Sequence, residues 1–138
     1  MGTSYDKDVV AWANEQAALL RAGQLSAIDI EHIAKEIEDV GKSEQRELAS
    51  RMAVLLAHLL KWQYQAGRRG ASWQKTIKSQ RMDIAYLLRY ARMSDADWLS
   101  IVWARAVAQA TDETGLDVFP DDCPWSMEQV LAFDFYPD

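Results

Sequence analysis

No proline occurs in the first 119 residues of this 138-residue chain, because all three prolines lie at or beyond Pro120. Proline breaks helices, whereas the residues that dominate this long stretch (Ala, Leu, Glu, Gln, Lys and Arg) favour them. No segment shows the sustained alternation of apolar and polar residues that is typical of a half-buried strand. The sequence therefore predicts an all-α fold.

Capping residues and glycines divide the chain into helices joined by short connections. We expect helices over about 6–21, from 26 or 29 to just before Gly41, and over about 43–65, 72–91 and 94–115. Ser126 and Gln129 form a capping-box pattern that opens a short last helix. Short connections favour antiparallel neighbours. The predicted architecture is an up-and-down bundle of four to five long helices plus a short C-terminal helix, as a single domain over residues 1–138.

The second predicted helix carries an apolar stripe at helical spacing, formed by Ile30, Ile33, Ala34 and Ile37. Such a stripe is typical of a side that faces a core. His32 lies on the opposite side of this helix, so we expect its imidazole to be exposed to solvent.

The third predicted helix carries polar residues where a bundle usually places apolar ones. Glu44, Arg51, His58 and Gln65 are spaced by seven and border the apolar positions of the heptad. His58 should therefore lie near the interior, where an imidazole needs a hydrogen-bond partner from a neighbouring helix. The polar cluster predicted on this basis consists of Glu36, Asp39, Glu44, Arg51, His58, Gln80 and Arg81.

Two interpretations of this cluster stay open. It can be a set of satisfied polar contacts that fixes the helix register. It can also be a small catalytic or ligand site, in which Glu36 and His58 perform acid–base or metal chemistry and Arg81 holds an anionic group.

The sequence predicts neither a metal nor a cofactor. Two histidines and one cysteine are too few for a closed zinc site, and no His-Glu-x-x-His motif occurs. Cys123 lies beside Asp121 and Asp122, whose negative charges disfavour the thiolate, so we expect a structural role for it. One cysteine cannot form an internal disulfide, and no segment is typical of a secretory signal or a membrane span. These features favour a cytoplasmic protein.

Basic residues are concentrated in one segment of an acidic chain. Residues 61–92 contain eight basic side chains and one acidic side chain, although the whole chain has a net charge of −6. Charge complementarity with acidic neighbouring helices explains this distribution. The alternative is a nucleic-acid-binding surface formed by Arg68, Arg69, Lys75 and Lys78, which the acidic composition disfavours.

Several blocks of the sequence resemble one known family. They are EIEDVGKSEQREL at 36–48, LLAHLLKWQYQ at 55–65, SWQKTIKSQR at 72–81 and FPDDCPWSMEQVL at 119–131. The chain resembles, over essentially its whole length, the bacterial family called domain of unknown function 29. The resemblance implies an all-α bacterial protein and no particular activity. Positions that fit the family pattern are Glu36, Glu38, Gly41, Glu44, His58, Trp62, Tyr64, Trp73, Gln80 and Arg81.

The absence of a recognisable catalytic motif favours a non-catalytic helical bundle. We expect it to work through contacts with an unknown protein partner or with itself. An enzyme or ligand-binding protein that uses Glu36, His58 and Arg81 is the alternative, and nucleic-acid binding is a weaker one.

Overall fold

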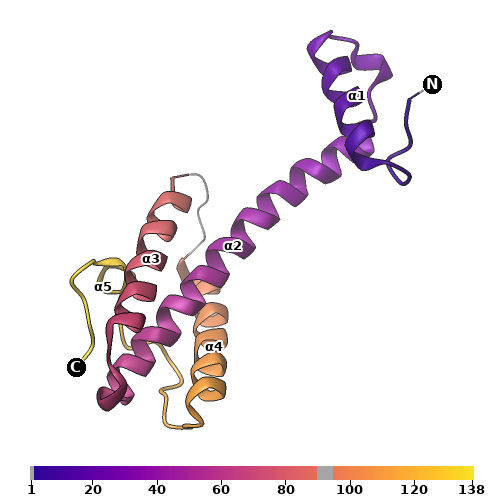
Figure 1. Cartoon of the computed structure of the whole chain (residues 1–138). Coiled ribbons are helices and arrows are strands. Elements are labelled where there is room, and N and C mark those ends of the chain that lie inside the picture. The colour runs from indigo at the N-terminus through magenta and orange to yellow at the C-terminus, as the bar shows by residue number, and fades with distance from the viewer. Residues whose placement is uncertain (1, 90–94) are drawn as a thin grey trace. The chain divides into compact units, whose positions relative to one another are not determined.

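The computed structural model describes residues 2–89 and 95–138, and of residues 95–99 only the backbone. The described residues contain no strand. The helices are α1 (Val9–Arg21), α2 (Ile30–Tyr64), α3 (Ala71–Leu87), α4 (Asp95–Thr114) and α5 (Met127–Leu131), with short 3₁₀ turns at Leu25–Ala27 and Ala66–Arg68 (Figure 1). Four of these helices are long and one is short, so the prediction of an all-α packed fold is confirmed.

The chain forms two compact units, Met1–Lys42 and Ser43–Asp138. In the first unit, Asp8 caps α1 by accepting a hydrogen bond from the Ala11 amide at 3.0 Å. Gly23 follows α1 with a φ of 72°, a backbone conformation that favours glycine, and lets the chain turn. The prediction of one domain over residues 1–138 stays a prediction.

The second unit holds the hydrophobic core. Leu48, Met52, Leu55, Leu56, Leu59 and Leu60 of α2 pack with apolar residues of α3, α4 and the C-terminal segment. In Figure 1, α3 and α4 flank the C-terminal half of α2, and α5 lies beside α3. The predicted capping box is confirmed, because Ser126 and Gln129 exchange hydrogen bonds at the start of α5.

The predicted helix break at Gly41 is wrong, because α2 continues through it from Ile30 to Tyr64. Glycine within a helix costs only about 1 kcal/mol relative to alanine, which neighbouring turns readily offset. Gly41 is also not among the glycines with positive φ. The second and third predicted helices are therefore one helix of 35 residues.

Two expectations for the N-terminal half of α2 are also wrong. Ile30 and Ile37 are exposed rather than buried, with 65% and 68% of their surface accessible. His32 is half-buried rather than solvent-exposed, and its ring stacks on Tyr5 at 4.1 Å. Both errors have one cause. Within the first unit, α1 and Tyr5 pack on the side of α2 that carries His32.

Candidate functional site

Asp29 is the centre of the first unit's contacts. Its Oδ2 accepts a hydrogen bond from the Trp12 indole at 3.0 Å and lies 2.7 Å from Nδ1 of His32. Its backbone amide donates to Oε1 of Gln16 at 2.7 Å. The hydrogen bond from His32, and secondly that from Trp12, lower the pKa of the Asp29 carboxyl, although partial burial opposes them. Asp29 therefore stays charged and joins the start of α2 to α1.

Glu36 and Asp39, two members of the predicted cluster, have their contacts inside the first unit. The Tyr5 hydroxyl donates a hydrogen bond to Glu36. Lys35 donates to Asp39 at 3.0 Å and to the Tyr5 hydroxyl at 3.3 Å. These contacts attach the N-terminal segment to α2, so both carboxylates have structural partners.

Arg51 joins α2 to α3 in the second unit. Its guanidinium pairs with Asp83 at 2.8 Å and with Glu47, one turn earlier on α2, at 3.1 Å. Gln80 is half-buried, and its Oε1 lies 3.5 Å from Arg51, at the limit of a hydrogen bond. Glu44 is also half-buried, but no hydrogen bond or ion pair of its side chain occurs among the described residues. Arg51 and Gln80 thus support the register of two helices.

Arg81 is buried, with 2% of its surface accessible, and fixes the C-terminal segment to α3. Its three nitrogens donate to the backbone carbonyls of Val130 at 2.8 Å, Phe133 at 3.3 Å and Phe135 at 2.7 Å. The guanidinium also lies 5.6 Å from the centre of the Tyr136 ring. Burial lowers the pKa of Arg81, which nevertheless stays protonated because that of a free guanidinium exceeds 12. Each of the three nitrogens thus has a backbone carbonyl as its partner.

An ion pair between Lys61 and Glu113 joins α2 to α4. Lys61 is buried, and its ammonium lies 2.6 Å from Oε2 of Glu113 and 5.4 Å from the Trp73 ring centre. Gln109 donates to the other carboxylate oxygen at 3.1 Å. Burial acts to raise the pKa of Glu113, but the hydrogen bonds from Lys61 and Gln109 together lower it. Sequence reasoning missed this pair, because 52 positions separate its members and no local pattern joins them.

His58 lies near this ion pair. Its Nδ1 is 2.8 Å from the Val54 carbonyl oxygen, which can only accept, so Nδ1 carries a hydrogen. The partner is thus the preceding turn of α2 rather than a side chain of another helix. Burial lowers the pKa of His58; the carbonyl opposes this, and the positive charge of Lys61 lowers it further. In the neutral ring Nε2 is an acceptor, with no hydrogen bond among the described residues.

We expect His58 to make the folded state sensitive to acid. Well above pH 6.5, the ordinary pKa of histidine, both states are neutral at this position and the imidazole contributes nothing to the pH dependence. As pH falls through that value, the unfolded chain binds the proton first, so the free energy of unfolding decreases until His58 itself is protonated. The imidazole is partly exposed, so the slope should be a fraction of the limiting value of about 1.4 kcal/mol per pH unit.

Urea unfolding of wild type and His58→Gln at pH 5 to 8 checks this expectation. The variant should show a smaller slope between pH 5 and 6.5 and a constant difference from wild type above pH 7. Equal slopes for wild type and His58→Gln would show that His58 binds its proton equally well in the folded and the unfolded chain. Glu113 does not interfere in this range, because its pKa is lowered and the stability that its carboxylate contributes is lost only at more acidic pH.

The four residues of the predicted basic surface have different environments in the structure. Arg68, Lys75 and Lys78 are exposed, and they form no ion pair with the described residues. Arg69 instead donates to the Trp62 carbonyl at 2.7 Å, and its guanidinium lies 5.2 Å from the Trp62 ring centre. Three of the four predicted cations are thus available to an anion.

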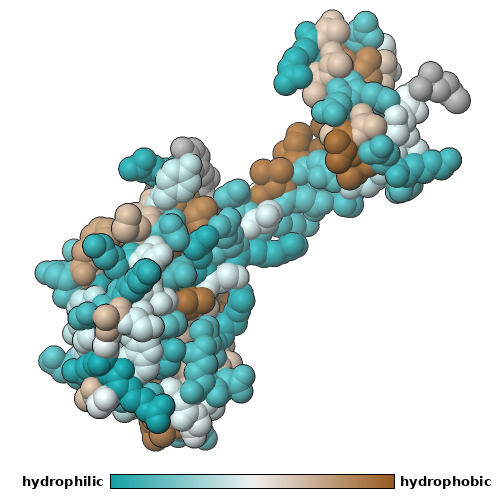
Figure 2. Space-filling view, in the orientation of Figure 1, coloured by the Kyte–Doolittle hydropathy of each residue, from teal (hydrophilic) through white to brown (hydrophobic). Residues whose placement is uncertain are grey.

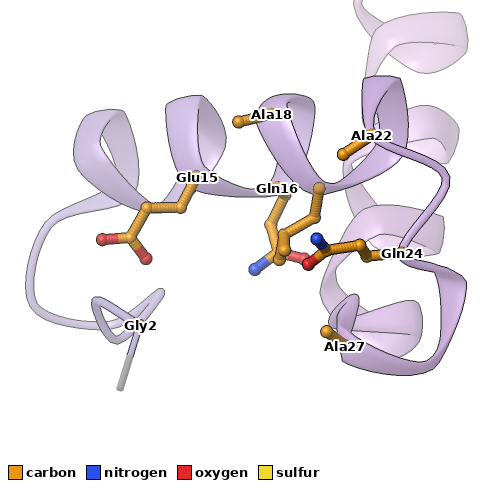
Figure 3. Close-up of a pocket in the computed structure, with 8 residues that line it drawn as sticks. Gly2, Glu15, Gln16, Ala18, Ala22, Gln24 and Ala27 are labelled. Atoms are coloured by element: carbon orange, nitrogen blue, oxygen red, sulfur yellow. The ribbon is translucent and has the colours of Figure 1, made fainter.

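A hollow of about 580 Å³ lies in the first unit, beside α1 (Figure 3). Its polar lining includes Glu15 and Gln16. Both oxygens of Glu15 accept hydrogen bonds from Thr3, at 2.5 and 2.6 Å, and Gln16 accepts from Asp29. The two hydrogen bonds from Thr3 lower the pKa of Glu15. The acceptors of Glu15 and Gln16 are therefore already used within the unit.

The described residues contain no group of three or more His, Cys, Asp or Glu side chains that could hold a metal ion. Within the same residues, no helix has the length and apolar character needed to cross a bilayer. Cys123 is half-buried and its thiol donates to the Trp125 carbonyl at 3.4 Å. Burial raises the pKa of this thiol, which disfavours a nucleophilic thiolate.

Comparison with known proteins identifies the family but not a biochemical activity. Neither the curated proteins nor the solved structures contain a match to this chain. One family model matches residues 4–136, and its description is domain of unknown function DUF29. The match covers nearly the whole chain, as the resemblance of the sequence blocks implied. The chain therefore belongs to the DUF29 family of domains of unknown function.

Proposed function

We propose that this protein is a non-catalytic interaction module that pairs with a second copy of itself through the N-terminal half of α2. The observation that carries the proposal is an exposed apolar stripe. Ile30, Ile37 and Val40 have 65%, 68% and 63% of their surface accessible, and Ala34 and Gly41 on the same part of the helix are also exposed. Figure 2 shows hydrophobic side chains gathered along this part of α2. Branched aliphatic side chains at helical spacing are typical of a helix that packs against another.

The stripe repeats the pattern of the buried part of the same helix. Ile30, Ala34, Ile37 and Gly41 each precede a core residue by 18 positions, or about five helical turns. Those core residues are Leu48, Met52, Leu55 and Leu59. The N-terminal half of α2 thus has the sequence of a core-facing helix, and this favours a helical partner.

Antiparallel pairing about Ile37 suits two copies of this stripe. In that arrangement Ala34 and Gly41 of one copy lie opposite the larger Val40 and Ile33 of the other, so small and large side chains alternate. Glu31 of each copy then lies within about one residue of Lys42 of the other, on the same edge of the helix. Neither Glu31 nor Lys42 forms an ion pair among the described residues, so both are available.

The catalytic alternative has less support. Arg81 donates to three backbone carbonyls and Glu36 accepts from Tyr5, so the contacts of both side chains are structural. His58 and Glu36 also belong to different units.

We expect the wild type to dimerise and Ile37→Glu to weaken dimerisation at least tenfold. The stripe is shorter than a standard interface, so the dissociation constant should be about 1–100 μM. Sedimentation velocity between 1 and 500 μM measures it. Ile101→Glu is the matched control, because Ile101 has 63% of its surface accessible but lies on α4. A wild type that is monomeric at all concentrations would rule out this interface. An equal loss of dimer affinity in Ile37→Glu and Ile101→Glu would also rule it out.

A charge exchange tests the antiparallel arrangement itself. Glu31→Lys and Lys42→Glu each place like charges opposite one another and should weaken the dimer several-fold. The double variant restores opposite charges and should recover most of the wild-type affinity. If the double variant loses as much dimer affinity as the two single variants together, the pairing about Ile37 is wrong.

A further inference from the structure

The C-terminal segment and α3 line an open hollow of about 510 Å³ in the second unit. Gln74, Lys75 and Lys78 of α3 form one wall, and Phe133 and Tyr136 form the other. We propose that this hollow binds a small planar anion, namely an aromatic ring that carries a phosphate group, as in a nucleoside monophosphate. This site is separate from the stripe on α2 and does not depend on it.

The aromatic wall is fixed in place by contacts outside the hollow. Arg81 holds the carbonyls of Phe133 and Phe135, which flank this part of the chain. The Tyr136 ring packs on Trp62 with centres 4.8 Å apart and on the Arg81 guanidinium at 5.6 Å. Phe133, by contrast, has 61% of its surface accessible. A fixed wall with one open aromatic ring suits stacking of a planar ligand.

The opposite wall is positively charged. Lys75 and Lys78 lie one turn apart on α3, both exposed, and neither pairs with an acid among the described residues. No carboxylate lines the hollow. In addition, α3 begins after Gly70 without a side-chain cap or an acid in its first turn, so its positive end is not neutralised there. Two ammonium groups at the lip of the hollow therefore favour a phosphate.

Size and chemistry together select the ligand class. Ligand pockets in proteins commonly measure about 300–1,000 Å³, so this hollow suits one ring system with one phosphate. The ring would stack on Phe133, the phosphate would contact Lys75 and Lys78, and the Gln74 amide would offer a polar contact. Because the hollow is open to solvent and has few polar groups, we expect a dissociation constant of about 0.1–1 mM.

Titration of the full chain with adenosine monophosphate, followed by amide NMR shifts at low salt, tests the proposal. Lys78→Glu and Phe133→Ala should each weaken binding about tenfold, since one removes a phosphate contact and the other a stacking partner. Arg68→Glu makes the same charge change at an exposed position outside the hollow, and should change affinity less than threefold. Both altered lining residues are exposed, and urea unfolding of each variant verifies that it folds.

Inorganic phosphate and adenosine separate the two parts of the ligand, and each should bind at least tenfold more weakly than the monophosphate. The proposal is overturned if the monophosphate shows no saturable binding up to about 10 mM, ten times the weakest expected dissociation constant. It is also overturned if inorganic phosphate binds equally well, or if Arg68→Glu weakens binding as much as Lys78→Glu.

Discussion

Arg81→Ala should reduce the free energy of unfolding by about 3–5 kcal/mol. The substitution removes three hydrogen bonds from a charged donor and leaves the carbonyls of Val130, Phe133 and Phe135 without these partners. Burying an unsatisfied carbonyl is costly, so the C-terminal segment should detach and expose Trp125 and Val130, both of which are buried in the wild type. Urea unfolding followed by tryptophan fluorescence measures the loss.

Two further variants separate geometry from charge. Arg81→Lys keeps the positive charge, but an ammonium cannot match three carbonyls that a planar guanidinium reaches in a fixed arrangement, so most of the loss should persist. Arg68→Ala removes an exposed arginine and should change stability by less than about 0.5 kcal/mol. If the free energy of unfolding of Arg81→Ala lies within about 1 kcal/mol of the wild-type value, the three hydrogen bonds of Arg81 do not hold the C-terminal segment.

The position of Arg81 illustrates what the sequence could predict. The sequence predicts Arg81 as a member of the polar cluster around His58, where it could hold an anionic group; its burial is a finding of the structure. Its partners are backbone carbonyls about 50 residues later, and a carbonyl has no residue-type signal that sequence reasoning can use. For the same reason, the sequence predicts a side-chain partner for His58, whereas the structure shows the Val54 carbonyl.

Periodicity predicts that a helix has an apolar side, but it does not say what covers that side. The stripe of Ile30 and Ile37 has the pattern of a core face, yet the first unit packs α1 and Tyr5 on the other side of α2, where His32, Trp12 and Asp29 interact. Aromatic stacking and hydrogen bonds to Asp29 decide this arrangement. A count of apolar residues does not detect them.

Trp12→Ala should unfold the first unit and leave the second folded. Trp12 is buried, contacts the Tyr5 ring at 4.9 Å between centres and donates to Asp29. Truncating a buried tryptophan costs about 3–5 kcal/mol, which a unit of only about 40 residues cannot readily offset. Among the described residues, the core of the second unit contains no residue of the first, so the substitution removes no side chain from that core. Amide hydrogen exchange should show lost protection over Val9–Arg21 and retained protection at Leu55–Leu60.

Local unfolding in this variant would mean that the two units are separate cooperative elements joined by α2. Trp12→Phe keeps a ring but loses the donor to Asp29, so it should be intermediate, and Val10→Ala, at an exposed position of α1, should leave protection unchanged. If Trp12→Ala instead lowers protection in both regions by the same factor, the chain unfolds as one domain over residues 1–138, as its sequence predicts. Because the α2 stripe lies within the first unit, the same variant should also weaken self-association if α1 is needed to position Ile30 and Ile37. Dimerisation that survives loss of α1 would show that α2 alone carries the interface.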